Sequence, residues 1–286
     1  MAPLELFSRD DVTKCVKREI TLACQRYRFS DEPKAILLAG QPGAGKTQLS
    51  TMFSRYLKGN AAFINADDYR RYHPNYHELY AKFGSDSVQL TSLFSSDVAN
   101  KLIDRLSDKH FNLIIEGTGR TVNVPQHTAE KLNVKGYTAE LAVIAARPEV
   151  SLISTLLRFY QMNVGGTIPR ATAVEAHDHI VDVLPNNLDL LLDVPEIARI
   201  TIWDRNMKML FNSENDCILP SEVLLNYWDS PWTNTEIQNA EEQIERLYLL
   251  EDSSGLGQLD IIKEISNRVP QIAFTENQDS SFELQM

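Results

Sequence analysis

The segment that most constrains the fold is the eight-residue stretch 40–47, which reads Gly-Gln-Pro-Gly-Ala-Gly-Lys-Thr. It follows the apolar run Ala35–Ala39 directly and leads into a stretch with helical periodicity at about 46–58. In this Gly-x-x-x-x-Gly-Lys-Thr pattern, glycines let backbone N–H groups close around phosphate oxygens, the lysine reaches the β and γ phosphates, and the threonine hydroxyl can ligate Mg²⁺. The pattern therefore predicts a strand, a loop and a helix that bind a nucleoside triphosphate through Gly40, Gln41, Pro42, Gly43, Ala44, Gly45, Lys46 and Thr47.

Apolar runs and helical patterns alternate along the rest of the chain. A capping box at Ser8 and Asp11 predicts a helix within the first 30 residues. The expected strands are Ala35–Ala39, Ala62–Asn65, Asn112–Glu116, Ala139–Ala145 and Arg199–Asp204, and the expected helices cover about 46–58, 86–109, 124–135, 148–163 and 172–193. Because these strands are apolar on both faces, we expect an α/β fold, a parallel sheet with helices on each side and ligands at the carboxyl ends of its strands.

The length of 286 residues indicates one large domain and an appendage. We expect a phosphate-loop domain over 1–220 and a C-terminal helical extension over 221–269. In the extension, helical spacing relates Ile237, Ala240, Ile244, Leu247 and Tyr248. The polar stretch 270–286 predicts a flexible tail.

Charge and hydropathy exclude several functions. The net charge is −11, and much of it lies in 234–286. An acidic chain without a basic cluster repels nucleic acid, so no nucleic-acid partner is expected. No run of about 18 apolar residues occurs, and the N-terminus lacks the zones of a signal peptide, which predicts a cytoplasmic protein without a membrane partner. Three cysteines without metal spacing, Cys15, Cys24 and Cys217, are expected to be reduced thiols.

Two carboxylates follow predicted strands and are candidates for chemistry. The carboxyl ends of parallel strands share one edge of a sheet, so Asp67 and Glu116 should face phosphates held by the loop. There a carboxylate can hold Mg²⁺ or accept the proton of an attacking hydroxyl. In the alternative interpretations, Asp67 or Asp68 caps a helix that begins at Tyr69, and Glu116 is a solvated loop residue.

Two arginines flank a Gly-Gly break in the helical pattern after the fourth strand. Arg158 lies in the pattern before the break, and Arg170 follows Gly165-Gly166-Thr167-Ile168-Pro169. Such a break is typical of a movable lid, whose arginines could close over a nucleotide and exclude water. From spacing alone, two solvated arginines fit equally well.

Several strings, taken together and in order, resemble the zeta toxins, kinases of bacterial toxin–antitoxin systems. The resemblance covers about 35–212 and is carried by the phosphate loop, Asn112-Leu113-Ile114-Ile115-Glu116-Gly117-Thr118-Gly119-Arg120-Thr121, Arg170-Ala171-Thr172 and Ala176-His177-Asp178. It implies a P-loop kinase-like fold that transfers the γ-phosphate of ATP to the 3′-hydroxyl of the amino sugar in UDP-N-acetylglucosamine. That reaction blocks the synthesis of cell-wall precursors until a small helical antitoxin protein covers the site.

The resemblance also implies roles for individual residues. Asp67 matches the general base, and Lys46, Arg158 and Arg170 match the cationic clamp on the γ-phosphate. Thr47 would hold the Mg²⁺ cofactor. The substrate groove would include Glu116, Thr118, Arg120 and Thr128, with Asn100 where the family has an acid that contacts the sugar.

Asn100 leaves the acceptor open, because an amide lacks the charge of an acid. A kinase of the same fold with a different or wider range of UDP-sugars, or another hydroxyl position, is therefore an alternative. Two further alternatives are an NTPase that uses water as acceptor and a nucleotide-binding interaction protein that acts through its acidic helical tail. The extension itself could pad the core, hold an antitoxin, mediate self-association or form a solvated surface.

Overall fold

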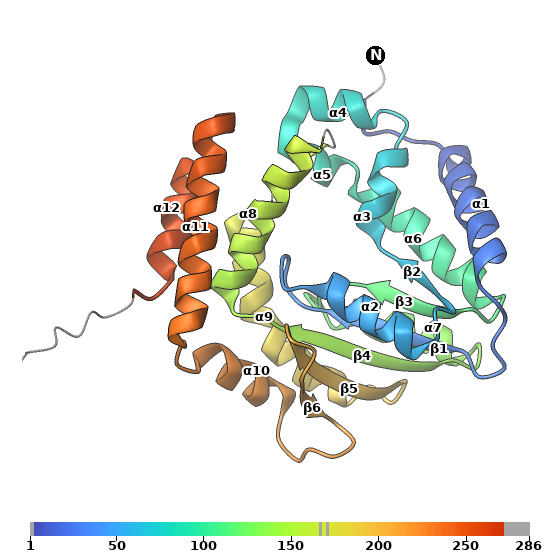
Figure 1. The fold of residues 1–286 in the computed structure, drawn as a ribbon. Helices are drawn as coiled ribbons and strands as arrows, with labels where there is room; N and C mark the ends of the chain where they lie inside the picture. The colour runs from blue at the N-terminus through green and yellow to red at the C-terminus, as the bar shows by residue number, and fades with distance from the viewer. Residues whose placement is uncertain (1–2, 166–167, 170–171, 272–286) are drawn as a thin grey trace, which may run out of the picture. The chain divides into compact units, whose positions relative to one another are not determined.

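The computed structural model describes residues 3–165, 168–169 and 172–271. The chain divides into two compact units, Met1–Ser230 and Pro231–Met286. The first unit contains the phosphate loop and the sheet (Figure 1).

A six-stranded sheet with the order β2-β3-β1-β4-β5-β6 forms the centre of the first unit. Its strands are β1 (Lys34–Ala39), β2 (Ala61–Ile64), β3 (Asn112–Glu116), β4 (Thr138–Ala145), β5 (Ile197–Asp204) and β6 (Met209–Asn212). The first five strands pair in parallel, and β6 pairs antiparallel with β5 at the edge. The predicted parallel sheet and its five strands are confirmed, whereas β6 was not predicted. At four residues β6 is too short to carry a strand pattern of its own.

Helices cover both faces of this sheet, as the sequence predicted (Figure 1). On one face Leu49 and Phe53 of α2 (Lys46–Tyr56) pack against Ile36 and Leu38. On the other face lie α6 (Ser92–Ser107), α7 (Asn123–Asn133) and α9 (Val174–Leu192), with α1 (Arg9–Arg26) against α6. The capping box of α1 is present as predicted. Alternate residues of β1 therefore pack into hydrophobic clusters on opposite faces of the sheet, which holds the strand, and the loop that follows it, in position.

The predicted helix 86–109 is interrupted. The structure has a short 3₁₀ turn (Gly84–Asp86), then α5 (Ser87–Leu90), and α6 begins only after Thr91. Thr91 has φ −95° and ψ 0°, away from ideal helical values, although its backbone N–H and its hydroxyl both donate to the carbonyl oxygen of Ser87, at 3.0 and 2.8 Å. Two further helices, α3 (Ala66–Tyr69) and α4 (Tyr76–Phe83), and the 3₁₀ turn Arg70–Tyr72 were not predicted.

Helix α8 (Pro148–Val164) ends shortly before the predicted break, and α9 begins after it. Helix α10 (Pro220–Asp229) packs on α9 within the first unit, although the sequence predicted that the extension begins at 221. Arg147 donates to the carbonyl oxygens of Trp228 and Ser230, both at 2.8 Å, which ties the end of α10 to the sheet domain.

The second unit is a pair of helices, α11 (Asn234–Ser254) and α12 (Leu259–Arg268), in contact with each other. Of the residues predicted to share one helical face, Ile237, Ala240, Ile244 and Leu247 are buried, and Tyr248 is partly exposed. Most of the predicted tail, 272–286, lies outside the described residues. No helix in the described part of the chain is long and apolar enough to cross a membrane.

Candidate active site

The phosphate loop turns sharply from β1 into α2, and Lys46 is the first residue of that helix. The Lys46 ammonium donates to the carbonyl oxygens of Gly40, at 2.8 Å, and Gln41, at 3.1 Å. Its side chain is only 8% exposed, and burial lowers the pKa of Lys46, although the Glu116 carboxylate opposes that shift. The structure thus holds a cation inside the loop, where the amino end of α2 also favours a phosphate.

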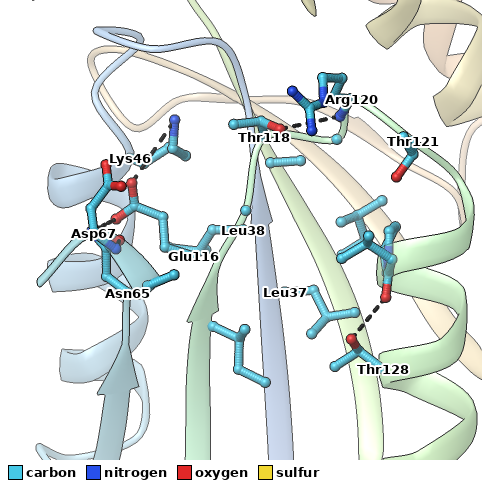
Figure 2. Close-up of a pocket in the computed structure, with 18 of the residues that line it drawn as sticks. Leu37, Leu38, Lys46, Asn65, Asp67, Glu116, Thr118, Arg120, Thr121 and Thr128 are labelled. Atoms are coloured by element: carbon cyan, nitrogen blue, oxygen red, sulfur yellow. Dashed lines mark hydrogen bonds and ion pairs between the residues drawn. The ribbon is translucent and has the colours of Figure 1, made fainter. Parts of the chain in front are cut away.

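Carboxylates from two neighbouring strand ends point toward this ammonium (Figure 2). Glu116, at the end of β3, places Oε1 4.0 Å from Lys46 Nζ and accepts a hydrogen bond from Asn65 Nδ2 at 3.2 Å. Asn65 also caps α3, since its Oδ1 accepts from the backbone N–H of Asp67 at 3.0 Å. One amide side chain therefore connects the two candidate carboxylate residues.

Asp67 lies in the first turn of α3, after β2. The alternative that Asp67 or Asp68 caps a helix starting at Tyr69 is wrong, because α3 begins at Ala66 and Asn65 is the cap. Asp67 is 44% exposed, and its Oδ1 lies 2.7 Å from Arg70 Nε. Arg70 belongs to the unpredicted 3₁₀ turn and is a neighbour that sequence reasoning missed.

A cavity of about 370 Å³ opens beside these groups. Its walls come from the ends of β1 and β3, the phosphate loop, α3, α6, α7 and α8. It brings together half of the predicted site residues, namely Pro42, Lys46, Asp67, Glu116, Thr118, Arg120, Thr128 and Arg158. The alternative in which Glu116 is a solvated loop residue does not fit, because Glu116 is largely buried at the cavity wall.

Two predicted residues, Asn100 and Thr47, lie outside the cavity lining, and a third, Arg170, is not among the described residues. Asn100 is exposed on α6 and is not among the residues that line the cavity, whereas Ser96, one turn earlier, is. Thr47 is exposed in the first turn of α2, also outside the lining. Arg170 lies outside the described residues, so its role in a clamp stays a prediction.

The loop after β3 forms the far side of the cavity and is bonded to its surroundings. The carbonyl oxygen of Thr118 accepts from the backbone N–H of Gly40 at 3.2 Å, and that of Gly119 accepts from Asn187 Nδ2 at 2.9 Å. Arg120 follows this anchored turn and is exposed at the cavity wall, while Thr128 reaches it from α7 (Figure 2). An exposed arginine opposite the phosphate loop suits a second anionic group, such as a pyrophosphate.

A buried polar network supports the phosphate loop from behind. Gln41 Nε2 donates to the carbonyl oxygen of Ala146 at 2.7 Å and to Ser151 Oγ at 3.3 Å. Ser151 Oγ lies 2.7 Å from His177 Nε2, and His177 Nδ1 lies 3.0 Å from Asp178 Oδ1. The network joins the loop to α8 and α9. Sequence reasoning missed it, because its members are far apart along the chain.

The Glu116 carboxyl makes stability depend on pH in a way that can be measured. Burial raises the pKa of Glu116 above its ordinary 4.5, so above that pH the unfolded state releases a proton that the folded state retains. The free energy of unfolding of the parent, compared with that of Glu116→Gln, should therefore fall as pH rises from about 4 to about 7. The fall should be about 1.4 kcal/mol for each pH unit by which folding raises the pKa of Glu116.

Urea unfolding of both proteins across this pH range measures the difference. Glu32→Gln, which removes an exposed carboxyl group, is the matched control. A difference between parent and Glu116→Gln that stays constant over the range would contradict the expectation.

The phosphate loop follows the first strand of a mostly parallel, helix-covered sheet, and acidic residues lie at the neighbouring strand ends. These features define a P-loop protein of the kinase type. The family model for zeta toxins matches residues 18–216, and the chain belongs to that family. The resemblance found in the sequence is thereby confirmed.

Individual relatives cover most of the chain. Toxin PezT of Streptococcus pneumoniae is 37% identical over 245 residues, which span 84% of this chain and 97% of PezT. Toxin zeta of Streptococcus agalactiae is 36% identical and covers 86% of each chain. A solved structure from the PezAT chromosomal toxin–antitoxin system of S. pneumoniae superposes with a TM-score of 0.77 at 32% identity, covering 86% of this chain and 99% of the other.

Proposed function

We propose that this protein transfers the γ-phosphate of ATP to a hydroxyl of the amino sugar in UDP-N-acetylglucosamine, with the 3′-hydroxyl as the expected acceptor. The observation that carries this proposal is the cavity itself. It runs from the phosphate loop past Asp67 to Thr118, Arg120 and Thr128, so donor and acceptor walls face one space. Membership of the zeta toxin family, whose members are kinases, supports the same reaction class.

In this mechanism Asp67 is the general base. Its carboxylate accepts the proton of the sugar hydroxyl as the hydroxyl oxygen attacks the γ-phosphorus, and the bond from that phosphorus to the bridging oxygen of ADP breaks. Lys46 and Arg158 stabilise the negative charge on the transferred group, and Arg170 is proposed to join them. Arg120 is proposed to bind the pyrophosphate of the UDP-sugar.

We propose that the reaction uses a magnesium ion held through the Thr47 hydroxyl, since Mg²⁺ prefers hard oxygen ligands. Mg²⁺ would neutralise charge on the β and γ phosphates. The protein residues bind, orient and deprotonate the acceptor.

A water-directed NTPase is less well supported than a kinase. Hydrolysis needs no acceptor wall, whereas here the wall after β3 is anchored and carries a cationic side chain at its surface. The position of Asn100 outside the lining favours keeping a second candidate, a kinase of the same fold with wider or different UDP-sugar specificity. Both candidates predict a phosphorylated UDP-sugar.

Product analysis tests the proposal directly. With ATP and Mg²⁺, we expect UDP-N-acetylglucosamine to yield ADP and a phosphorylated UDP-sugar, with ³¹P and ¹H NMR locating the new ester. UDP-glucose and UDP-N-acetylgalactosamine test the wider specificity, and a reaction without acceptor is the control. Release of inorganic phosphate alone, in every reaction, would leave the NTPase interpretation and remove the kinase one.

The biological consequence follows from the product. A phosphorylated precursor cannot serve cell-wall synthesis, so we propose that the protein is toxic to bacteria until an antitoxin binds it. The structural relative comes from a toxin–antitoxin system, which supports a protein partner of this kind. We propose a small helical antitoxin that covers the nucleotide site.

A further inference from the structure

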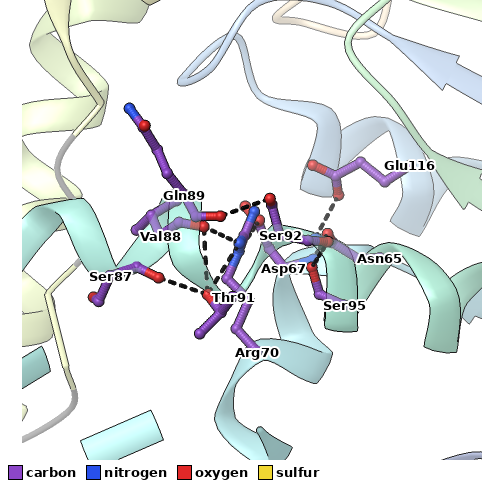
Figure 3. Close-up of polar contacts among 10 residues, drawn as sticks. All are labelled: Asn65, Asp67, Arg70, Ser87, Val88, Gln89, Thr91, Ser92, Ser95 and Glu116. Atoms are coloured by element: carbon purple, nitrogen blue, oxygen red, sulfur yellow. Dashed lines mark hydrogen bonds and ion pairs between the residues drawn. The ribbon is translucent and has the colours of Figure 1, made fainter. Parts of the chain in front are cut away.

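The guanidinium group of Arg70 makes three polar contacts through two of its nitrogens (Figure 3). Its Nε lies 2.7 Å from Asp67 Oδ1. Its Nη1 donates to the carbonyl oxygen of Val88 and to Thr91 Oγ1, the latter at 3.2 Å. The Arg70 side chain is 12% exposed, so the cation is mostly buried, whereas Asp67 is 44% exposed and lines the cavity.

The anchors of Arg70 arise from the interrupted helix. Val88 lies in α5, a four-residue helix. The last carbonyl groups of a helix carry partial negative charge and accept hydrogen bonds from donors outside it. The Thr91 hydroxyl, at the junction with α6, is fully buried. Arg70 therefore donates through Nη1 to the Val88 carbonyl oxygen and the Thr91 hydroxyl, and contacts Asp67 through Nε.

This arrangement differs from an ordinary surface ion pair. Exposed pairs three residues apart contribute about 0–1 kcal/mol, because solvent screens them and both side chains lose freedom. Here the cation is already fixed by groups other than its ionic partner, so little further ordering is needed when it contacts Asp67. The neighbouring Arg71 is exposed and instead stacks over the Tyr72 ring, 4.9 Å from its centroid.

We propose that Arg70 is a positioning residue that keeps the Asp67 carboxylate ionised and aimed into the cavity; the proposal rests on the proposed role of Asp67 as general base. A carboxylate can accept the hydroxyl proton only while it is ionised, and a fixed cation at one oxygen favours that state. Within the described part of the chain, other charged groups around Asp67 include Asp68 on α3, Lys46 on α2, Glu116 on β3 and Arg158 on α8. The two acids disfavour the ionised form of Asp67, which Arg70 favours. Lys46 and Arg158 favour that form too, but in the proposed mechanism they also bind the phosphates.

The test compares Arg70→Gln, Arg70→Lys and the matched control Arg71→Gln, which removes the same charge one residue away. For Arg70→Gln we expect kcat for phosphoryl transfer to fall about 10- to 100-fold with an unchanged KM for ATP, since the phosphate loop is untouched. The ¹³C NMR titration of the Asp67 carboxyl carbon should shift its midpoint upward by about 1 to 3 pH units. Arg70→Lys should recover part of both effects, and Arg71→Gln should match the parent.

The NMR titration separates this proposal from the proposed function. If the parental protein phosphorylates no UDP-sugar, the proposed function fails, while the titration still decides whether Arg70 controls the ionisation of Asp67. An unchanged midpoint in folded Arg70→Gln, or an unchanged kcat in an active enzyme, overturns the proposal. If Arg70→Gln does not fold, Thr91→Val removes one anchor with little change of shape, and the same titration decides: a raised midpoint supports the proposal and an unchanged one overturns it.

Discussion

Replacing Asp67 with asparagine is expected to abolish phosphoryl transfer while leaving ATP binding intact. An amide has nearly the shape of a carboxylate but cannot accept the hydroxyl proton, so the loss should reach about 100- to 10,000-fold in kcat. ATP binding should persist, because the phosphate loop and Lys46 are held by Gly40 and Gln41 and not by Asp67. Initial rates with a UDP-sugar acceptor measure the first effect, and calorimetric titration with ATP measures the second.

Asp68→Asn provides the matched control for this variant. Asp68 is the next residue in the same helical turn and carries the same charge, but it is exposed and does not line the cavity. The control should keep most of the parental activity. In bacteria without an antitoxin, the parent and Asp68→Asn should arrest growth and Asp67→Asn should not. Turnover of Asp67→Asn at the parental rate would remove Asp67 from the role of general base.

Replacing Gly43 with alanine is expected to weaken nucleotide binding. Gly43 has a φ of +77°, a conformation that costs a residue with a side chain about 1–2 kcal/mol. A Cβ atom there would also overlap the backbone carbonyl oxygen of Ser151 and come within 2.9 Å of Thr155 Cγ2. The loop must therefore move away from α8, and its N–H groups lose their alignment. We expect ATP affinity to fall about 10-fold or more, equivalent to about 1.4 kcal/mol for each factor of ten.

Gly59→Ala is a control that introduces the backbone strain of Gly43→Ala without its steric overlap with α8. Gly59 has a nearly equal φ of +71°, but no described atom lies within 4 Å of a Cβ atom built on it. This variant should therefore lose about 1 kcal/mol of stability and bind ATP as the parent does. Calorimetric titration with ATP and thermal unfolding of both variants provide the comparison. Equal ATP affinities for the two variants would show that the packing of Gly43 against α8 is unimportant for the loop.

The elements that sequence analysis predicted correctly are those with a strong local pattern. Strands β1 to β5 are apolar runs between polar breaks, and α2, α7, α8 and α9 carry sustained helical spacing. The missed elements, α3, α4 and β6, are four to eight residues long, so they offer too few positions for a pattern. The interruption at Thr91 was also missed, because it is a departure of a single residue from helical backbone angles within a continuous helical pattern.

The same distinction applies to the candidate site. Because the carboxyl ends of parallel strands share one edge of a sheet, the sequence predicted that Lys46, Asp67 and Glu116 lie together. In the structure all three line one cavity. The partners of these groups could not be found in this way. Arg70 lies in a polar run without periodicity, and its anchors Val88 and Thr91 lie about twenty residues further along the chain.

The class of chemistry could be predicted from local features of the chain. The phosphate loop, the order of strands and helices, and the acidic residues after the strands are local features, and local backbone preferences are enough to place them. The folded chain was needed to see how Asp67 is held, that Glu116 is buried beside Lys46, and that Ser96 lines the cavity while Asn100 does not. These properties depend on side chains from distant segments meeting at short range, which no pattern along the chain encodes.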